Sequence, residues 1–266
     1  MIIHWNASPE IFNLGPLSLR WYGLLFAVGF ALAYRLGVKI YRQEKVAVEL
    51  VDSLIVYTVV GTVIGARLVH CLFYEPDYYL QNPLEILMVW KGGLASHGAV
   101  LGIFASILVF KWRHAKPSIA WMTDMVSVTS PIAAGCIRLG NVMNSEVYGK
   151  PTSGDWGVVF ERINESPIAR HPAQFYEAII YFIVAAIMWV YYQKKRQMGS
   201  GACFGLMICL VFGSRFVVEF FKENQEDFDL GLPINMGQLL SIPFFAIGAF
   251  FFIRAHFWSK NKTTGP

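Results

Sequence analysis

The chain has 266 residues, of which 55% are hydrophobic and only 15% are charged. Its mean hydropathy of +0.46 is too high for a soluble domain, which would have to bury more apolar side chains than its core can hold. The composition therefore excludes an ordinary soluble domain. The net charge of +4 does not indicate nucleic-acid binding, because the basic residues gather in the connections between apolar segments.

Seven apolar segments follow one another along the chain. A helix of about 20 apolar residues crosses the roughly 30 Å of hydrocarbon in a bilayer. We expect transmembrane helices at 17–38, 53–73, 95–111, 119–138, 173–192, 203–221 and 237–257. No Lys or Arg precedes Arg20, so the basic leader of a cleavable signal peptide is missing. We therefore expect the first helix to remain part of the mature protein. The sequence thus predicts an all-α integral membrane protein, with residues 1–266 forming a single polytopic membrane domain.

The connections between these segments differ in charge. One alternating set holds 13 of the 22 basic residues, whereas the opposite set holds six. By the positive-inside rule, this difference places the N-terminus outside and the C-terminus in the cytoplasm. The longest connection, 141–172, then lies outside and surrounds an apolar run at 156–160 with Gly, Pro, Ser and charged residues. We expect a small folded head there, between the fourth and fifth helices.

Three arginines lie within the predicted spans or at their ends, in the outer half of the membrane: Arg67, Arg138 and Arg215. An arginine in hydrocarbon costs several kcal/mol, so it usually faces a polar cavity and marks a functional site. Guanidinium groups bind phosphate through paired hydrogen bonds and keep their charge. Two structural alternatives stay open, since Arg215 and Glu219 stand four residues apart on one helical face and Arg67 could extend to the interface.

Two further residues at the predicted outer interface could contact a substrate. His97 follows Gly92-Gly93 and precedes Gly98 at the start of the third span. A histidine there is usually a polar interface residue, yet an ordinary histidine pKa of about 6.5 suits proton acceptance. Tyr22 belongs by default to an aromatic belt and secondarily to a headgroup contact.

The four cysteines form no CxxC pair and lie inside apolar segments: Cys71, Cys136, Cys203 and Cys209. Cysteine in such a segment usually behaves as a small buried hydrophobic residue. We therefore expect neither a metal site nor a disulfide.

The densest polar stretch, RLGNVMNSEVYG at 138–149, resembles the signature of the prolipoprotein diacylglyceryl transferases, approximately G-R-x-G-N-aromatic-x-N-x-E-x-x-G. Four more motifs match and extend the resemblance to nearly the whole chain: Gly92-Gly93 with His97-Gly98, RHPAQFYE at 170–177, Arg215 with Glu219, and MGQLLSIP at 236–243. Two positions depart from the signature, with Ile137 in place of Gly and Val142 in place of an aromatic residue. Both concern packing and leave the charged and amide positions intact.

The resemblance implies the first step of bacterial lipoprotein maturation in the plasma (inner) membrane, with the head in the periplasm. This family moves a diacylglyceryl group from phosphatidylglycerol to the thiol of the lipobox cysteine in a prolipoprotein signal peptide, releasing glycerol phosphate. The implied partners are phosphatidylglycerol, such precursors and membrane lipids, and no nucleic acid. The reaction needs no cofactor or metal, and the nucleophile arrives with the substrate.

The resemblance also assigns roles to particular residues. It implies that His97 is catalytic, as the family's histidine is, and that Arg138 and Arg215 stabilise negative charge on the departing glycerol phosphate. The residues expected to bind phosphatidylglycerol are Tyr22, Arg138, Asn141, Asn144, Glu146, Gly149 and Glu219. Among these, the two Asn residues would donate neutral hydrogen bonds, and the two Glu residues would orient or balance the arginines.

Two other classes of protein are alternatives. A lipid or solute transporter could use a phosphate-binding cavity, but transport needs access from both faces, and the inner halves of these spans lack a matching polar track. A purely structural membrane anchor would have no reason to retain arginines within the membrane. Transfer of the diacylglyceryl group is therefore the function that we expect.

Overall fold

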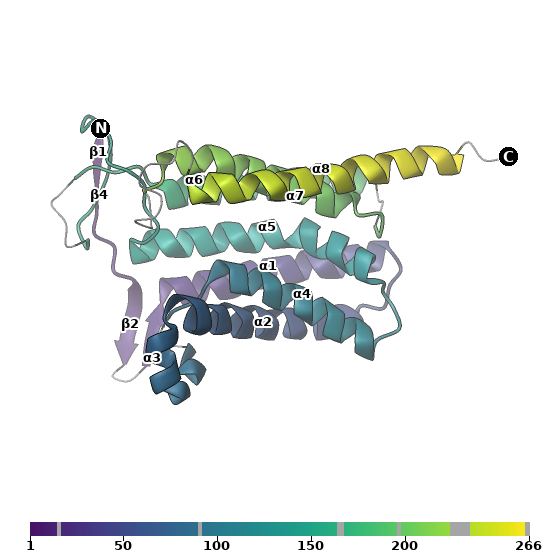
Figure 1. Ribbon diagram of the computed structural model, residues 1–266, viewed down its shortest axis with the longest axis horizontal. Coiled ribbons are helices and arrows are strands. Elements are labelled where there is room, and N and C mark those ends of the chain that lie inside the picture. The colour runs from purple at the N-terminus through teal and green to yellow at the C-terminus, as the bar shows by residue number, and fades with distance from the viewer. Residues whose placement is uncertain (15–16, 90–91, 164–167, 196–197, 224–234, 264–266) are drawn as a thin grey trace. The chain divides into compact units, whose positions relative to one another are not determined.

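A computed structural model describes residues 1–14, 17–89, 92–163, 168–195, 198–223 and 235–263 (Figure 1). The chain is mostly helical, as the sequence predicts. It divides into two compact units, one formed by Met1–Ala33 with Asp124–Pro266 and the other by Tyr34–Thr123.

Seven long helices overlap the seven predicted spans: α1 (Trp21–Gln43), α2 (Glu49–Val69), α4 (Ser96–Arg113), α5 (Ile119–Asn144), α6 (Ala173–Lys195), α7 (Ala202–Val218) and α8 (Met236–Thr263). Within the described ranges, five segments are long and apolar enough to cross a membrane, and they overlap α1, α2, α6, α7 and α8. A multi-pass membrane protein is thus confirmed, whereas seven crossings stay a prediction.

In the unit formed by Tyr34–Thr123, α2 and α4 pack with their backbones in contact. A Cβ atom added to Gly65 would lie 2.3 Å from the Gly98 carbonyl oxygen, and one added to Gly102 would lie 1.9 Å from that of Gly61. Small residues let membrane helices approach closely enough for extensive van der Waals contact. This packing fixes the start of α4, where His97 lies.

In the other unit, α7 and α8 also meet at glycines, since a Cβ atom on Gly205 would lie 2.6 Å from the Gly248 carbonyl oxygen. The buried Asp124 carboxylate of α5 accepts backbone N–H groups from Gly199 at 2.8 Å and from Phe204 at 2.9 Å. These bonds tie the turn before α7 to α5. Buried acceptors of this kind satisfy backbone donors that would otherwise lack partners at a helix start.

Within the described residues, four short strands add to the predicted all-helical fold. Strand β1 (Ile2–Trp5) pairs in parallel with β4 (Gly157–Phe160), and β2 (Glu10–Leu14) pairs antiparallel with β3 (Leu17–Arg20). The predicted first span is therefore wrong at its start, because residues 17–20 are extended and the helix begins at Trp21. Residues 17–20 form β3, which pairs with β2, and helix α1 starts directly after them.

The connection 141–172, expected to form a head, contains β4, which pairs with β1 from the N-terminal segment. The Trp5 indole Nε1 donates to the Val142 carbonyl oxygen at 3.1 Å, which joins the end of β1 to the end of α5. Within this connection, residues 164–167 lie outside the described part of the chain. The strands thus lie beside the polar stretch that the sequence singled out.

Candidate active site

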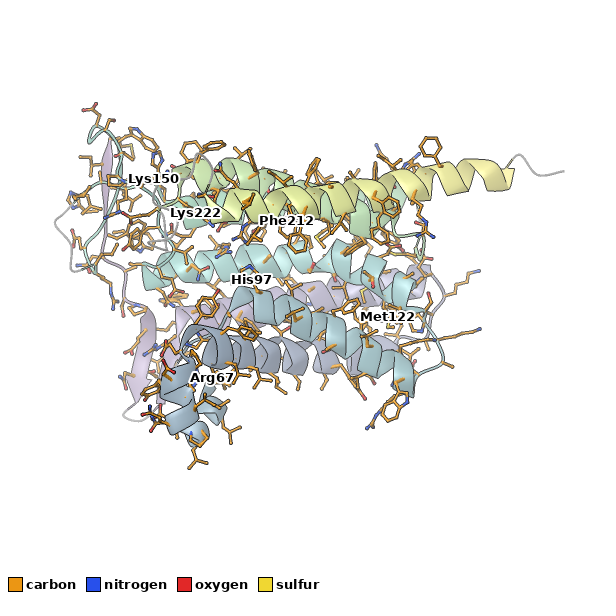
Figure 2. The ribbon with its side chains drawn as sticks, in the orientation of Figure 1. Arg67, His97, Met122, Lys150, Phe212 and Lys222 are labelled. Atoms are coloured by element: carbon orange, nitrogen blue, oxygen red, sulfur yellow. The ribbon has the colours of Figure 1, made fainter. Side chains whose placement is uncertain are left out.

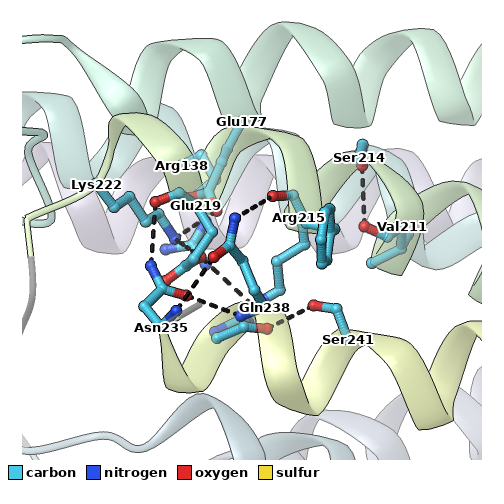
Figure 3. Close-up of polar contacts among 12 residues, drawn as sticks. Arg138, Glu177, Val211, Ser214, Arg215, Glu219, Lys222, Asn235, Gln238 and Ser241 are labelled. Atoms are coloured by element: carbon cyan, nitrogen blue, oxygen red, sulfur yellow. Dashed lines mark hydrogen bonds and ion pairs between the residues drawn. The ribbon is translucent and has the colours of Figure 1, made fainter. Parts of the chain in front are cut away.

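A buried cluster of charged side chains joins α5, α6 and the end of α7 (Figure 3). The Glu177 carboxylate of α6 is 2% exposed and lies 2.8 Å from Nε of Arg138 on α5. Its other oxygen lies 2.7 Å from Nζ of Lys222, which follows α7 and is 7% exposed. A carboxylate buried this deeply stays charged only with close cations or hydrogen bonds. Glu177 therefore joins two cations from distant parts of the sequence.

A second carboxylate, Glu219, extends the cluster. It begins the short helix η4 (Glu219–Phe221) and lies 3.6 Å from Lys222 and 3.9 Å from Nε of Arg215. The pairing of Arg215 with Glu219, left open by the sequence, is thus present but long. Two carboxylates are shared by three cations. This group carries one surplus positive charge, which suits an anion.

The start of α8 supports Glu219 from the other side. Asn235 donates from Nδ2 to the Glu219 carbonyl oxygen at 3.1 Å, and Gln238 donates from Nε2 to the Phe216 carbonyl oxygen at 3.4 Å. A Cβ atom on Gly237 would lie 2.4 Å from the Glu219 carboxyl carbon. The MGQLLSIP motif thus supplies a residue without a side chain where Glu219 needs space.

The polar stretch 138–149 forms a chain of hydrogen bonds that starts at Arg138. Its terminal NH1 donates to Oδ1 of Asn141 at 3.2 Å, and Nδ2 of Asn141 donates to Glu146 at 2.7 Å. Asn144 donates to the same Glu146 oxygen at 3.2 Å. Glu146 therefore accepts bonds from the two amides, and Asn141 links it to Arg138.

Tyr22 and Gly149 lie in the same unit as this chain. The Tyr22 ring packs on α5, where a Cβ atom on Gly140 would lie 2.8 Å from it. Gly149 N donates to the His171 carbonyl oxygen at 2.8 Å, and a Cβ atom there would lie 2.3 Å from the Phe221 carbonyl oxygen. Gly149 therefore allows close backbone approach next to Lys222. Burial lowers the pKa of His171, so its imidazole adds no charge here at neutral pH.

His97 and Arg67 belong to the other unit, on α4 and α2 (Figure 2). His97 is the second residue of α4, with an exposed side chain. Arg67 is 2% exposed and donates to carbonyl oxygens of the connection that precedes α4. Its Nε bonds Ile86 at 3.0 Å, and its two terminal nitrogens bond Gly92 at 2.5 Å and Glu85 at 2.6 Å.

These bonds give Arg67 a role that the sequence did not suggest, and at 2% exposure its side chain does not extend to the interface. Its guanidinium holds the connection formed by α3 (Pro76–Gln81), η2 (Pro83–Leu87) and the Gly92-Gly93 turn. Three groups of one guanidinium bonded to backbone carbonyls indicate a structural anchor rather than a phosphate ligand. By holding Gly92, Arg67 also holds the turn that leads to His97.

Sequence reasoning assigned no role to Glu177 and Lys222, although both are central in the cluster. Glu177 lies in the RHPAQFYE motif. A glutamate on an apolar helix was the one signal in the sequence that could have indicated its role. Lys222 is one of the six basic residues on the outer set of connections, where a lysine is usually solvated. Among the described residues, no group of three or more His, Cys, Asp or Glu could hold a metal ion. The chemistry available to the cluster is anion binding by fixed cations.

Comparisons with known proteins agree with this chemistry. A family model described as prolipoprotein diacylglyceryl transferase matches residues 9–254. A phosphatidylglycerol–prolipoprotein diacylglyceryl transferase from Tolumonas auensis is 45% identical over 247 residues, covering 93% of this chain and 95% of the relative. Proteins of the same name from Chloroherpeton thalassium and Bacteroides fragilis are each 44% identical, covering 92% and 98% of this chain and 91% and 97% of the relatives. The chain belongs to the prolipoprotein diacylglyceryl transferase family.

Proposed function

We propose that this protein transfers the diacylglyceryl group of phosphatidylglycerol to the cysteine thiol of a prolipoprotein, releasing glycerol phosphate. The observation that carries this proposal is the buried cluster in which three cations share Glu177 and Glu219. The reaction places a phosphate diester at the site and leaves a phosphate with one more negative charge. Fixed cations in a site with little water stabilise that added charge strongly.

In this mechanism the thiolate sulfur attacks the glyceryl carbon that carries the phosphate. A carbon–sulfur bond forms, the carbon–oxygen bond to phosphate breaks, and its electron pair stays on the phosphate oxygen. The product is a thioether-linked diacylglyceryl cysteine, and glycerol phosphate leaves. No covalent bond to the enzyme is formed, which agrees with a chain whose own cysteines lie in apolar segments.

The contacts of the two arginines suggest different roles for them. Arg138 uses Nε for Glu177 and NH1 for Asn141, so most of its fork is held by protein groups. Arg215 pairs with Glu219 through Nε at the long distance of 3.9 Å, and its side chain is 27% exposed. We therefore assign the first phosphate contact to Arg215. Arg138 then orients the cluster and adds positive charge beside it.

His97 is proposed as the general base. A free thiol has a pKa of about 8.5, so only a few per cent is ionised at neutral pH, and a base close to the thiol raises the thiolate fraction. Imidazole is suited to this transfer because its own pKa lies close to neutral pH. The exposed position of His97 at the start of α4 leaves it accessible to a thiol from another protein.

Tyr22, Asn141, Asn144, Glu146, Gly149 and Glu219 are proposed to form the remaining phosphatidylglycerol site. Tyr22 and Gly149 would shape its walls, and the amides would donate hydrogen bonds. Glu146 and Glu219 would hold these donors and Arg215 in place. No cofactor and no metal enters the proposed reaction.

We propose that the protein crosses a bacterial plasma membrane seven times and carries a periplasmic head at 141–172. The N-terminus would lie outside and the C-terminus in the cytoplasm, since 13 of the 22 basic residues lie on one set of connections. An alkaline phosphatase fused after Lys262 should then be inactive, and one fused within the head should be active. The opposite pattern would place the cation cluster on the wrong face for a secreted precursor.

The transfer itself is tested with purified protein in vesicles that contain phosphatidylglycerol labelled in its headgroup glycerol. With a lipobox peptide, labelled glycerol phosphate should be released, and the peptide should gain the mass of diacylglycerol less one water. A peptide with serine in place of the cysteine should give neither product. Movement of labelled lipid across the bilayer without release of glycerol phosphate would support a transporter instead.

A further inference from the structure

A polar cleft of about 470 Å³ opens beside the candidate site, in the unit that carries the N-terminus. Its lining comes from the segment before β2, the first residue of β2, the last residue of β3, the polar stretch 138–149 where α5 ends, and the connection after β4. The lining residues are Ser8, Pro9, Glu10, Arg20, Asn144, Glu146 and Arg162.

Two of the lining residues connect the cleft with the cation cluster. Asn144 and Glu146 face the cleft, and they are also bonded to each other at 3.2 Å. Glu146 in turn accepts from Asn141, which accepts from Arg138. A ligand in the cleft would therefore lie next to the group that the proposed reaction uses.

The charges in the cleft are balanced, in contrast to those of the cluster. Two arginines and two glutamates line it. Arg20 and Glu10 form a partly exposed ion pair at 3.7 Å, and Arg162 has a long bond of 3.5 Å to the Ala7 carbonyl oxygen. A phosphate would need a surplus of positive charge, which the cleft lacks. Exposed donors and acceptors in equal measure suit a peptide, whose backbone offers both C=O and N–H groups.

We propose that this cleft binds the polar segment that directly follows the reacting cysteine of the precursor, an inference that rests on the proposed function. The next Cα atom lies about 3.8 Å from that of the cysteine, so this segment must lie in a space that adjoins the reaction site. A precursor whose folded part lies in water requires that space to be polar and open. The cleft has both properties, and its charged walls select among precursors by the charges that follow the cysteine.

The test compares two lipobox peptides that differ only in carrying two aspartates or two lysines directly after the cysteine. In the Arg162→Glu variant, the ratio of kcat/KM for the aspartate peptide to that for the lysine peptide should fall about five- to tenfold. The KM for phosphatidylglycerol should stay at the parent value. Arg20→Glu should change the ratio in the same direction, which gives a second variant if the first fails to fold.

The matched control is Glu161→Arg, a charge change of equal size at the neighbouring residue, which lies outside the cleft and pairs with His4 at 3.2 Å. It should leave the ratio unchanged, whereas a general surface field would shift the ratio in the opposite direction. An unchanged ratio in both cleft variants would overturn the proposal. So would a raised KM for phosphatidylglycerol or weaker inhibition by added glycerol phosphate, because either would assign the cleft to the headgroup. If the proposed function itself is wrong, the result is different: the parent enzyme transfers the diacylglyceryl group to neither peptide.

Discussion

Glu177 Oε1 lies 2.7 Å from Nζ of Lys222, although 45 positions of sequence separate the two residues. The second oxygen of the same carboxylate lies 2.8 Å from Arg138. Glu177 therefore decides how two of the three cations are placed. Removal of one partner from a buried ion pair is costly, because the remaining charge stays buried without compensation.

Glu177→Gln should destabilise the protein by about 3 to 5 kcal/mol and slow transfer at least tenfold, since Arg138 and Lys222 lose their shared anion. Adding Lys222→Met should raise the unfolding temperature of the Glu177→Gln variant, because the double variant contains one fewer uncompensated cation. Thermal unfolding in detergent and the transfer rate in vesicles measure both effects. If the effects of Glu177→Gln alone and of Lys222→Met alone on stability simply add up in the double variant, Glu177 and Lys222 do not act as a pair.

Arg138→Lys should fail almost as badly as Arg138→Ala, with turnover about ten- to a hundredfold below the parent. Lysine keeps the charge, but a single ammonium on a different stem cannot bond Glu177 through one nitrogen and Asn141 through another. Each bond to a charged group contributes roughly 1.5 to 3 kcal/mol. The rates of well-folded variants are compared in phosphatidylglycerol vesicles, with Arg35→Lys as the control. An Arg138→Lys enzyme running above about half the parent rate contradicts the assigned geometry.

The sequence could predict the helices and part of the site, because both depend on local patterns. Apolar runs locate the long helices, and the stretch from Arg138 to Glu146 is close enough in sequence to form one network. The pairing of Glu177 with Lys222 depends on how α6 meets the end of α7, which no local pattern contains. Lys222 in particular resembled a solvated residue of a connection until its partners were known.

Two other features show the same limit. Arg67 was expected either to face a phosphate or to extend to the interface, and its actual role depends on carbonyl groups 18 to 25 positions away. Strand β1 was missed because a four-residue strand has little pattern of its own, and its partner β4 lies far along the chain. Nothing in the printed sequence brings those two segments together.

Gly149→Ala should reduce transfer strongly, because the added methyl group would lie 2.3 Å from the Phe221 carbonyl oxygen and 2.9 Å from that of His171. The backbone beside Lys222 would have to move, and the cation would leave its position between the two carboxylates. Gly23→Ala is the matched control, since a Cβ atom there meets nothing within 4 Å. Equal rates for the two alanine variants contradict a need for close approach at Gly149.

His97→Gln should slow transfer by about a hundredfold or more at pH 7 without unfolding the protein. The deficit should shrink by about tenfold or more at pH 9, because the substrate thiol, with a pKa of about 8.5, is then mostly ionised without a base. Transfer rates of parent and variant across this pH range measure the deficit. A deficit that is the same at pH 7 and pH 9 would show that His97 acts through something other than proton removal.

The central claim is that the cluster built on Arg138, Glu177 and Lys222 supports a phosphate contact by Arg215. An experimental structure with a bound, non-reactive phosphonate analogue of phosphatidylglycerol tests it most directly. The account predicts the phosphonate oxygens within hydrogen-bond distance of the terminal nitrogens of Arg215, with Arg138 still paired with Glu177. A phosphonate held by Arg20 and Arg162 in the polar cleft, with no contact to Arg215, would contradict it.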